Sequence, residues 1–242
     1  MLLTIIFEEK YMFIKVLKTV ALASLLTGVT QAAEIEVKII NNTGASTFTP
    51  LLVTTHAHNT QLYTIGSEAS VALQTMAEGG NIALLVSDLN SEEATVVANP
   101  NEGLLFAGKS TTATLNTTAT NDSLSIVAMI LPTNDGFVAL NNWKVPTEPG
   151  VYRVNLNAYD AGTEANDEVI NGGAPLGTAG IPADPSGNAG ENATGFDTEA
   201  EGFVHVHRGV LGDTDPEGGK SDLDATKHRW LNPVATAIIT VK

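Results

Sequence analysis

The chain contains no cysteine. A domain without cysteine has no disulfide, so its stability must come from its hydrophobic core. The same absence excludes thiolate metal sites, cysteine nucleophiles and a lipid-modified N-terminal cysteine. With 242 residues, the chain is long enough to form one domain with a sizeable core.

Basic side chains are also scarce. The chain has 12 Lys and Arg against 27 Asp and Glu, and its formal net charge is −15 at pH 7. Such an acidic surface repels nucleic acids and anionic membranes. Cations, basic proteins and neutral sugars remain open as partners.

The long apolar run lies close to the N-terminus. Lys15 and Lys18 precede the uncharged run 19–29, and small residues then lead to Ala32, as a signal peptidase requires. The run is too short to span ~30 Å of hydrocarbon as an anchor. The sequence therefore predicts a signal peptide over residues 1–32.

Removal of this peptide leaves residues 33–242 as one domain. We expect Met12 to be the true start, because the Glu8-Glu9 pair before it disturbs the signal pattern. No second apolar span follows, so we expect a secreted protein without a transmembrane anchor. The extracellular space, the cell surface and a periplasm all fit this prediction.

Most of the remaining chain consists of short runs rich in Val, Ile, Thr and Leu, bounded by Gly, Asn or Pro. We expect strands at 34–40, 48–55, 94–98, 111–115, 124–131, 151–158, 203–210 and 235–241. Ser67–Glu78 differs, because it combines a Ser cap, apolar residues at helical spacing and a Gly79-Gly80 stop. One short helix among many strands predicts an all-β, antiparallel sandwich or barrel.

A long acidic connection lies between two of these strands, over residues 160–202. It holds nine acidic residues, and no Lys or Arg occurs between Arg153 and Arg208. A loop of this length is either mobile or held in place by something else. A bound cation and a mobile acidic loop are the two alternatives.

Three acidic residues follow directly after predicted strands. Asp135 comes after the strand 124–131, and Asp160 and Glu164 come after the strand 151–158. Ca²⁺ prefers such oxygen ligands, usually six to eight in a flexible cage. Acidic residues in turns are also common as solvated caps, so spacing alone leaves both interpretations open.

Several segments resemble those of one known family. Pro132-Thr-Asn-Asp-Gly-Phe137 and Tyr159-Asp-Ala-Gly-Thr-Glu164 resemble the Pro-Ser-Pro-Asp-Trp and Trp-Asp-Ala-Gly-Thr-Asp segments of the spondin domain found in F-spondin. Asp215-Pro-Glu-Gly-Gly219 and Phe48-Thr-Pro-Leu-Leu52 are similar to further segments of that family. Their order and approximate separations agree, so the resemblance covers essentially all of residues 34–242.

The resemblance implies a C2-like antiparallel β-sandwich that binds Ca²⁺ through Asp135, Asp160 and Glu164. It also implies a non-catalytic interaction module of the extracellular matrix or cell surface, whose partner is an extracellular or cell-surface protein or polysaccharide. The chain departs from the family where Glu164 replaces an Asp and where Gly136 displaces the aromatic residue. The cysteines and thrombospondin repeats of animal members are also missing.

Histidine offers a second set of candidate ligands. His56 and His58 form one His-x-His pair, His205 and His207 form another, and His228 stands alone. On a strand, the two members of a pair point to the same face and present two imidazoles to Zn²⁺ or Cu²⁺. The alternative function is therefore a secreted transition-metal-binding protein or metal-dependent enzyme. A polar strand face or a hydrogen-bonded network is the more common explanation of such pairs when no third ligand is identified.

A third acidic segment, Asp213–Asp224, imitates an EF-hand loop. Pro216 and Lys220 are poorly placed for such a loop, and the last position is Asp in place of a bidentate Glu. We therefore expect a turn, with a weak second cation site as the alternative.

Catalytic motifs are missing from the sequence. It contains no Gly-x-Ser-x-Gly, dinucleotide-binding fingerprint or His-Glu-x-x-His. We therefore expect a binding protein and not an enzyme.

Overall fold

The computed structural model describes residues 32–172, 178–187, 190, 193–215 and 218–242. Ala32–Lys242 forms one compact unit. The predicted signal peptide at residues 1–32 lies outside the described residues, apart from Ala32. Within the described residues, every helix is too short or too polar to cross a membrane.

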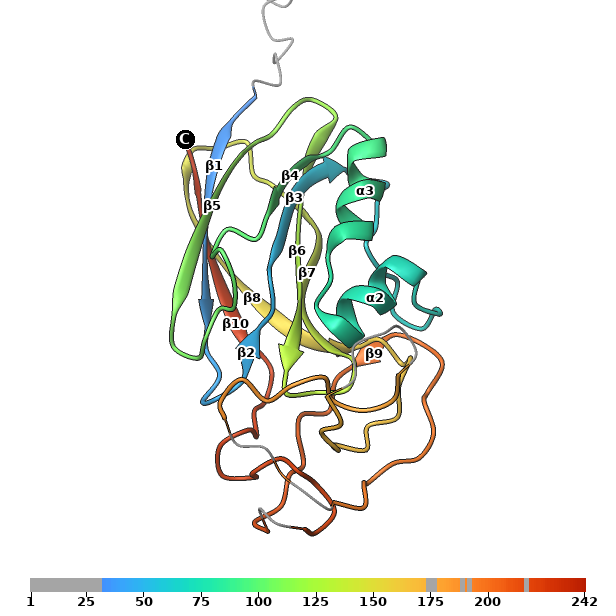
Figure 1. The fold of residues 1–242 in the computed structure, drawn as a ribbon. Helices are drawn as coiled ribbons and strands as arrows, with labels where there is room; N and C mark the ends of the chain where they lie inside the picture. Colours follow the sequence, from blue (N-terminus) through green and yellow to red (C-terminus); the bar gives the residue numbers. More distant parts are fainter. Residues whose placement is uncertain (1–31, 173–177, 188–189, 191–192, 216–217) are drawn as a thin grey trace, which may run out of the picture. The chain divides into compact units, whose positions relative to one another are not determined.

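Ten strands and two helices follow one another along the described chain. They are β1 (Glu34–Asn41), β2 (Thr47–Phe48), β3 (Leu52–Ala57), α2 (Val71–Gly79), α3 (Ala83–Ser91), β4 (Thr95–Ala98), β5 (Ser110–Asn116), β6 (Asn121–Leu131), β7 (Gly136–Lys144), β8 (Gly150–Asp160), β9 (His205–Val206) and β10 (Ala235–Val241). The strands form one antiparallel sheet (Figure 1). The prediction of an antiparallel, mostly β fold is confirmed.

The sheet nearly closes on itself. Its strands run in the order β4-β3-β6-β7-β8-β10-β1-β5, and β2 and β9 pair with β6 and β8 beside this path. The two ends of the order lie close together: Thr55 Oγ1 of β3, the strand next to β4, donates a hydrogen bond to the Asn116 carbonyl of β5, at 2.8 Å. The result is a barrel-like sheet with its main hydrophobic core inside.

Strand β8 carries different chemistry on its two faces. Its first part pairs with β10 and its last part, Asn157–Asp160, pairs with β7. Alternate side chains point to opposite faces of a strand. Leu156, Ala158 and Asp160 are therefore buried on one face, while Asn155 is exposed and Asn157 is half-buried on the other.

Two hydrophobic clusters stabilise the domain without disulfides. The larger cluster fills the inside of the sheet and includes Ile35, Val37 and Ile39 of β1. The smaller cluster packs α2 against the outer face of β6 and β7, with Leu73 and Met76 buried there. Each such side chain contributes roughly 1.5–3 kcal/mol when fully buried.

The helical region contains two helices, so the prediction of a single short helix was wrong. Helix α2 falls in the predicted range and extends one residue beyond it, to Gly79, and Ser70 Oγ caps it by accepting a hydrogen bond from Leu73 N at 3.1 Å. Helix α3 lacks a side-chain cap at Ile82 and leaves Leu84 exposed. Both features weaken the helical signal in the sequence.

Strand predictions were accurate at most positions, with three differences. β7 was missed, because its Gly and two Asn residues have low strand propensity. The predicted strand 48–55 is split into β2 and β3 around Pro50, and the predicted strand 203–210 is reduced to the two residues of β9.

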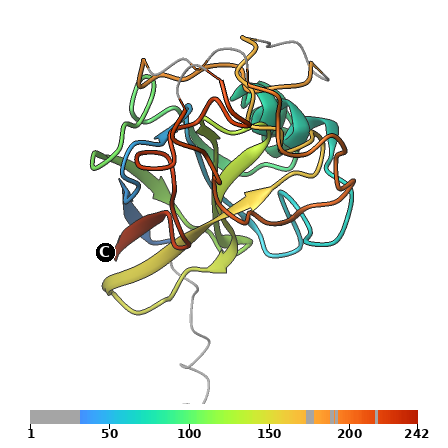
Figure 2. The same cartoon turned by 90° about the horizontal axis from the view of Figure 1, so that it is seen from below.

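The acidic segment and the following loops lie at the end of the sheet where β8 meets β9 (Figures 1 and 2). The buried carboxylate of Glu168 accepts hydrogen bonds from Leu211 N at 2.7 Å, Gly212 N at 2.8 Å and Ser221 Oγ at 2.6 Å. Acidic side chains thus bind backbone N–H groups and connect the loops to one another. This arrangement places the loops over the end of β8.

Candidate metal centre

Asp135 and Asp160 lie next to each other although they are 25 positions apart in the sequence. Asp135 occupies the turn between β6 and β7, and the residue after it, Gly136, pairs with Asp160 at the end of β8. Both aspartates are fully buried. Antiparallel pairing of β7 and β8 therefore brings two carboxylates into the interior at the loop end of the sheet.

The two oxygens of Asp135 have different environments. Oδ2 accepts hydrogen bonds from Thr163 N at 2.7 Å, Thr163 Oγ1 at 3.1 Å and Glu164 N at 3.1 Å. Oδ1 is buried and has no hydrogen-bond partner. Burial and the neighbouring Asp160 raise the pKa of Asp135 to about 7, because they outweigh these hydrogen bonds.

A tight turn follows Asp160 and positions its carboxylate. Oδ1 accepts a hydrogen bond from Gly162 N at 2.8 Å, and Oδ2 accepts one from Asn166 Nδ2, also at 2.8 Å. Gly162 has a φ of +68°, and a Cβ at this position would overlap the backbone of Phe203. Glycine is therefore required in the Asp-Ala-Gly-Thr segment by both backbone conformation and space.

Glu164 faces a further buried carboxylate, Glu78 at the end of α2. Their exposed fractions are 5% and 6%. Glu164 Oε2 accepts a hydrogen bond from Gly180 N at 3.2 Å. Burial, followed by the charges of Glu78 and Asp135, raises the pKa of Glu164 to about 8. Sequence reasoning missed Glu78, because it lies in a predicted helix far from the strand ends.

His205 and Glu201 complete a second group around Asp160. His205 Nε2 lies 3.6 Å from Asp160 Oδ1 and 3.6 Å from Glu201 Oε1. Among the described residues, these three offer ligand atoms that all lie within 4.8 Å of one another, and Asp135 and Glu164 are not part of this group. Three residues of this kind at this separation can hold a metal ion.

The hydrogen bonds of His205 prepare it to act as a ligand. Its Nδ1 lies 3.0 Å from the carbonyl oxygen of Val206 and donates to it. In the neutral ring, Nε2 then carries a lone pair, and this atom has no hydrogen-bond partner. Burial disfavours the charged ring, but the Val206 carbonyl and the carboxylates of Asp160 and Glu201 outweigh it and raise the pKa of His205.

His207 has the opposite arrangement. Its Nδ1 accepts a hydrogen bond from Gly209 N at 2.9 Å, so the proton of the neutral ring is on Nε2. Nε2 lies 3.9 Å from Asp160 Oδ2. Burial lowers the pKa of His207 to about 4, and its ring packs 5.0 Å from that of Trp230. Within this pair, His205 presents a lone pair to the carboxylates and His207 presents a proton.

The other His-x-His pair has ordinary hydrogen bonds. His56 Nδ1 lies 2.8 Å from the Ala57 carbonyl and Nε2 lies 2.7 Å from Ser125 Oγ. His58 Nδ1 lies 3.1 Å from Ser123 Oγ. These contacts join β3 to β6 and match the hydrogen-bonded network that was the alternative to a metal site.

The segment that imitates an EF-hand loop is a turn at its described residues. Asp213 accepts hydrogen bonds from the backbone N–H groups of Asp215 at 2.9 Å, Lys220 at 2.8 Å and Ser221 at 3.0 Å. These bonds lower the pKa of Asp213. Its carboxylate therefore holds the turn, as in an Asx-type loop. Residues 216–217 lie outside the described part.

Comparison with models of protein families gives a match for the chain. A spondin_N family model matches residues 41–169, which is more than half of the chain. The matched region contains Glu78, Asp135, Asp160 and Glu164, whereas Glu201 and His205 follow it. No curated protein matches the chain. The family match agrees with the resemblance carried by the Asp-Ala-Gly-Thr segment, and the chain belongs to the spondin_N family.

Proposed function

We propose that this protein is a secreted, calcium-binding spondin module that acts by binding a partner and not by catalysis. The observation that carries the proposal is a set of four carboxylates, each at most 6% exposed, at one end of the sheet: Glu78, Asp135, Asp160 and Glu164. As part of this proposal, the sheet is a C2-like sandwich in which β8 passes from one layer to the other. The pairing of β8 first with β10 and then with β7 supports this arrangement.

The electrostatics of the four carboxylates favour a bound cation. Burial and neighbouring carboxylates raise the pKa values of Asp135 and Glu164 to about 7 and about 8. A divalent cation relieves this repulsion and satisfies Asp135 Oδ1, which has no hydrogen-bond partner. Ca²⁺ is the ion that best suits carboxylate and carbonyl oxygens in a flexible loop. Asp135, Asp160 and Glu164 would hold it.

Calorimetric titration of the metal-free domain with Ca²⁺ tests this site. Extracellular modules bind Ca²⁺ with Kd values of ~10⁻⁴–10⁻³ M. We expect one ion per chain for the wild type, no binding for Asp135→Asn and wild-type binding for the control Asp88→Asn, whose side chain is exposed on α3. Equal binding by Asp135→Asn and Asp88→Asn would contradict the assignment.

The partner in this proposal is an extracellular or cell-surface protein or polysaccharide. The net charge of −15 disfavours nucleic acids and anionic membranes as partners. The metal acts here as a structural link between the β6–β7 turn and the start of the acidic segment. Pull-down of partners with and without chelator measures whether this link is needed for binding.

A second candidate function is the binding of Zn²⁺ or Cu²⁺ by Asp160, Glu201 and His205. The Nε2 lone pair of His205, directed at two carboxylates, specifically favours it, since imidazole nitrogen suits these metals better than Ca²⁺. Three protein ligands with a fourth position open is the usual arrangement of catalytic zinc. A metal-dependent enzyme would therefore use this group.

Metal analysis of protein purified without an affinity tag separates the two candidates. Ca²⁺ alone supports the calcium module, and stoichiometric Zn²⁺ or Cu²⁺ supports the second candidate. His205→Gln removes the transition metal in the second case and leaves the Ca²⁺ content unchanged in the first.

A further inference from the structure

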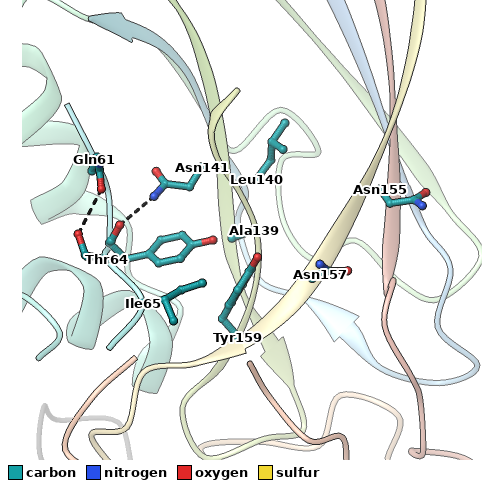
Figure 3. Close-up of a pocket in the computed structure, with 10 residues that line it drawn as sticks. Gln61, Thr64, Ile65, Ala139, Leu140, Asn141, Asn155, Asn157 and Tyr159 are labelled. Carbon is teal, nitrogen blue, oxygen red and sulfur yellow. Dashed lines mark hydrogen bonds between the residues drawn. The ribbon is translucent and has the colours of Figure 1, made fainter. Parts of the chain in front are cut away.

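A pocket of about 470 Å³ lies on the face of β8 opposite to Asp160 (Figure 3). One wall is the connection of residues 61–65 between β3 and α2, and the floor is formed by residues 139–141 of β7. The other wall consists of alternate side chains of β8, namely Asn155, Asn157 and Tyr159. Its volume lies within the range of about 300–1,000 Å³ that is common for small-molecule sites.

The pocket is neutral in a strongly acidic protein. None of the ten side chains that line it is charged, although the chain contains 27 acidic residues. A site for an ionic ligand needs an opposite charge or a dense set of charged donors. This lining therefore suits an uncharged ligand that is rich in hydrogen-bonding groups.

Two carboxamides are available to such a ligand. Asn155 is exposed and Asn157 is half-buried, and in the described structure neither side chain has a hydrogen bond within the protein. Each carboxamide offers a carbonyl acceptor and an NH₂ donor. Neighbouring hydroxyl groups on a sugar ring both donate and accept, so one carboxamide can bind two of them. Figure 3 shows both asparagines on the same strand.

The opposite wall is held rigidly. Asn141 Nδ2 donates to the Tyr63 carbonyl at 2.8 Å, and its Oδ1 accepts from Leu62 N at 3.3 Å. Thr64 Oγ1 donates to Gln61 Oε1 at 3.2 Å (Figure 3). A wall that is already ordered lowers the entropic cost of binding.

Aromatic rings provide an apolar surface in the same pocket. The rings of Tyr159 and Tyr63 lie 5.1 Å apart, and Tyr63 packs edge-on against Phe137 at 5.2 Å. Such packing fixes the orientation of the tyrosines. The C–H face of a sugar ring can pack against an aromatic ring while its hydroxyl groups reach the carboxamides.

We propose that this pocket binds a neutral saccharide unit of a cell-surface or extracellular polysaccharide. This proposal rests on the proposed function in one respect, because it names the partner of the binding module. The pocket itself uses none of the metal-centre residues. Acidic saccharides are disfavoured, because the protein carries a net charge of −15 and the pocket offers no cationic side chain.

The test is an array of neutral and acidic oligosaccharides probed with the folded domain, followed by calorimetric titration of those that bind. We expect neutral oligosaccharides to bind, Asn157→Ala to weaken binding at least tenfold, and Asn155→Ala to weaken it less, because Asn155 is more exposed. The control is Asn116→Ala, an exposed strand asparagine on β5 outside the pocket, which should bind as the wild type does.

Two results would overturn the proposal: no neutral oligosaccharide binds, or Asn157→Ala binds as tightly as Asn116→Ala. The melting temperature of each variant verifies that it is folded. Titrations in Ca²⁺ and in chelator separate the two proposals. Saccharide binding that persists in chelator supports the pocket whatever the outcome at the metal centre, and binding that disappears there would overturn the placement in this pocket.

Discussion

The two faces of β8 carry opposite kinds of polar chemistry. On the inner face, Asp160 is fully buried beside Asp135 and close to two histidines. On the outer face, Asn155 and Asn157 border an uncharged pocket. Buried charges need hydrogen-bond donors or a cation, and here turns and loops provide the donors. The outer face carries no buried charge, so it needs neither a set of donors nor a cation. Its polar groups are the neutral carboxamides of Asn155 and Asn157.

The pH dependence of stability is the largest effect expected from the inner face. The pKa of Asp135 is raised from 3.8 to about 7 and that of Glu164 from 4.5 to about 8. The folded state therefore holds protons that the unfolded state has released. The free energy of unfolding of the metal-free protein should therefore fall as the pH rises from about 4 to about 8. Each pH unit between the unfolded and folded pKa values of Asp135 should lower it by roughly 1.4 kcal/mol.

Urea denaturation of the metal-free domain across this pH range measures the effect. Saturating Ca²⁺ should flatten the profile, because the ion replaces the protons. Asn157→Ala, on the outer face, should leave the profile unchanged. A metal-free profile that rises between pH 4 and pH 8 would show that the inner carboxylates are not in this environment.

Removal of the charge of Asp160 should abolish the response to calcium. Binding to the folded state stabilises the wild type by ~2.7 kcal/mol when Ca²⁺ is a hundredfold above Kd. Asp160→Asn should lose most of this gain, and Glu164→Gln should lose less, since Glu164 departs from the family pattern. Thermal denaturation with and without Ca²⁺ gives both values. If wild type and Asp160→Asn respond alike, Asp160 is not a calcium ligand.

The turn after Asp160 should be sensitive to a single methyl group. Gly162→Ala introduces both an unfavourable positive φ and a clash with the backbone of Phe203, so we expect a loss of about 1–3 kcal/mol. Gly66 has a φ of +83° but open space around it, so Gly66→Ala should cost about 1 kcal/mol. Chemical denaturation compares the two. Equal losses would mean that the contact with Phe203 is unimportant.

The histidines of β9 and the loop after it should differ in their effects, and His205 should give the smallest change in stability of these substitutions. His207 is buried and accepts a hydrogen bond from Gly209 N, so His207→Gln should cost about 1–3 kcal/mol. His205 is partly exposed, and His205→Gln should change stability by less than about 0.5 kcal/mol. Denaturation of the two metal-free variants tests this difference. A larger loss for His205→Gln would contradict the environments described for the pair.

Local sequence determined most of the strands. Alternating polar and apolar residues in β1 and β5 and β-branched runs in β6 and β10 are enough to identify them. The same signals are weak in β7, which contains Gly136 and two asparagines, and in α3, which lacks a side-chain cap. Tertiary packing overrides these propensities, since β7 gains two neighbouring strands and α3 packs through Leu85 and Leu89.

For the candidate metal site, too, some features can be predicted from the sequence and others depend on the tertiary structure. The sequence by itself placed Asp135, Asp160 and Glu164 close to the ends of predicted strands, and the family resemblance grouped them as metal ligands. Only the tertiary structure placed Glu78 beside Glu164 and Glu201 beside Asp160. These neighbours come from a helix and from a long loop whose positions depend on how the whole chain packs.

Tertiary structure also decided which histidines differ in chemistry. His56, His58, His205 and His207 form two identical short motifs in the sequence. The hydrogen bond from His205 to its neighbouring carbonyl and the bond from Gly209 N to His207 assign opposite protonated nitrogens to the two rings. A sequence motif determines which groups are present, whereas the backbone around each ring decides which nitrogen carries the proton and which can bind a metal.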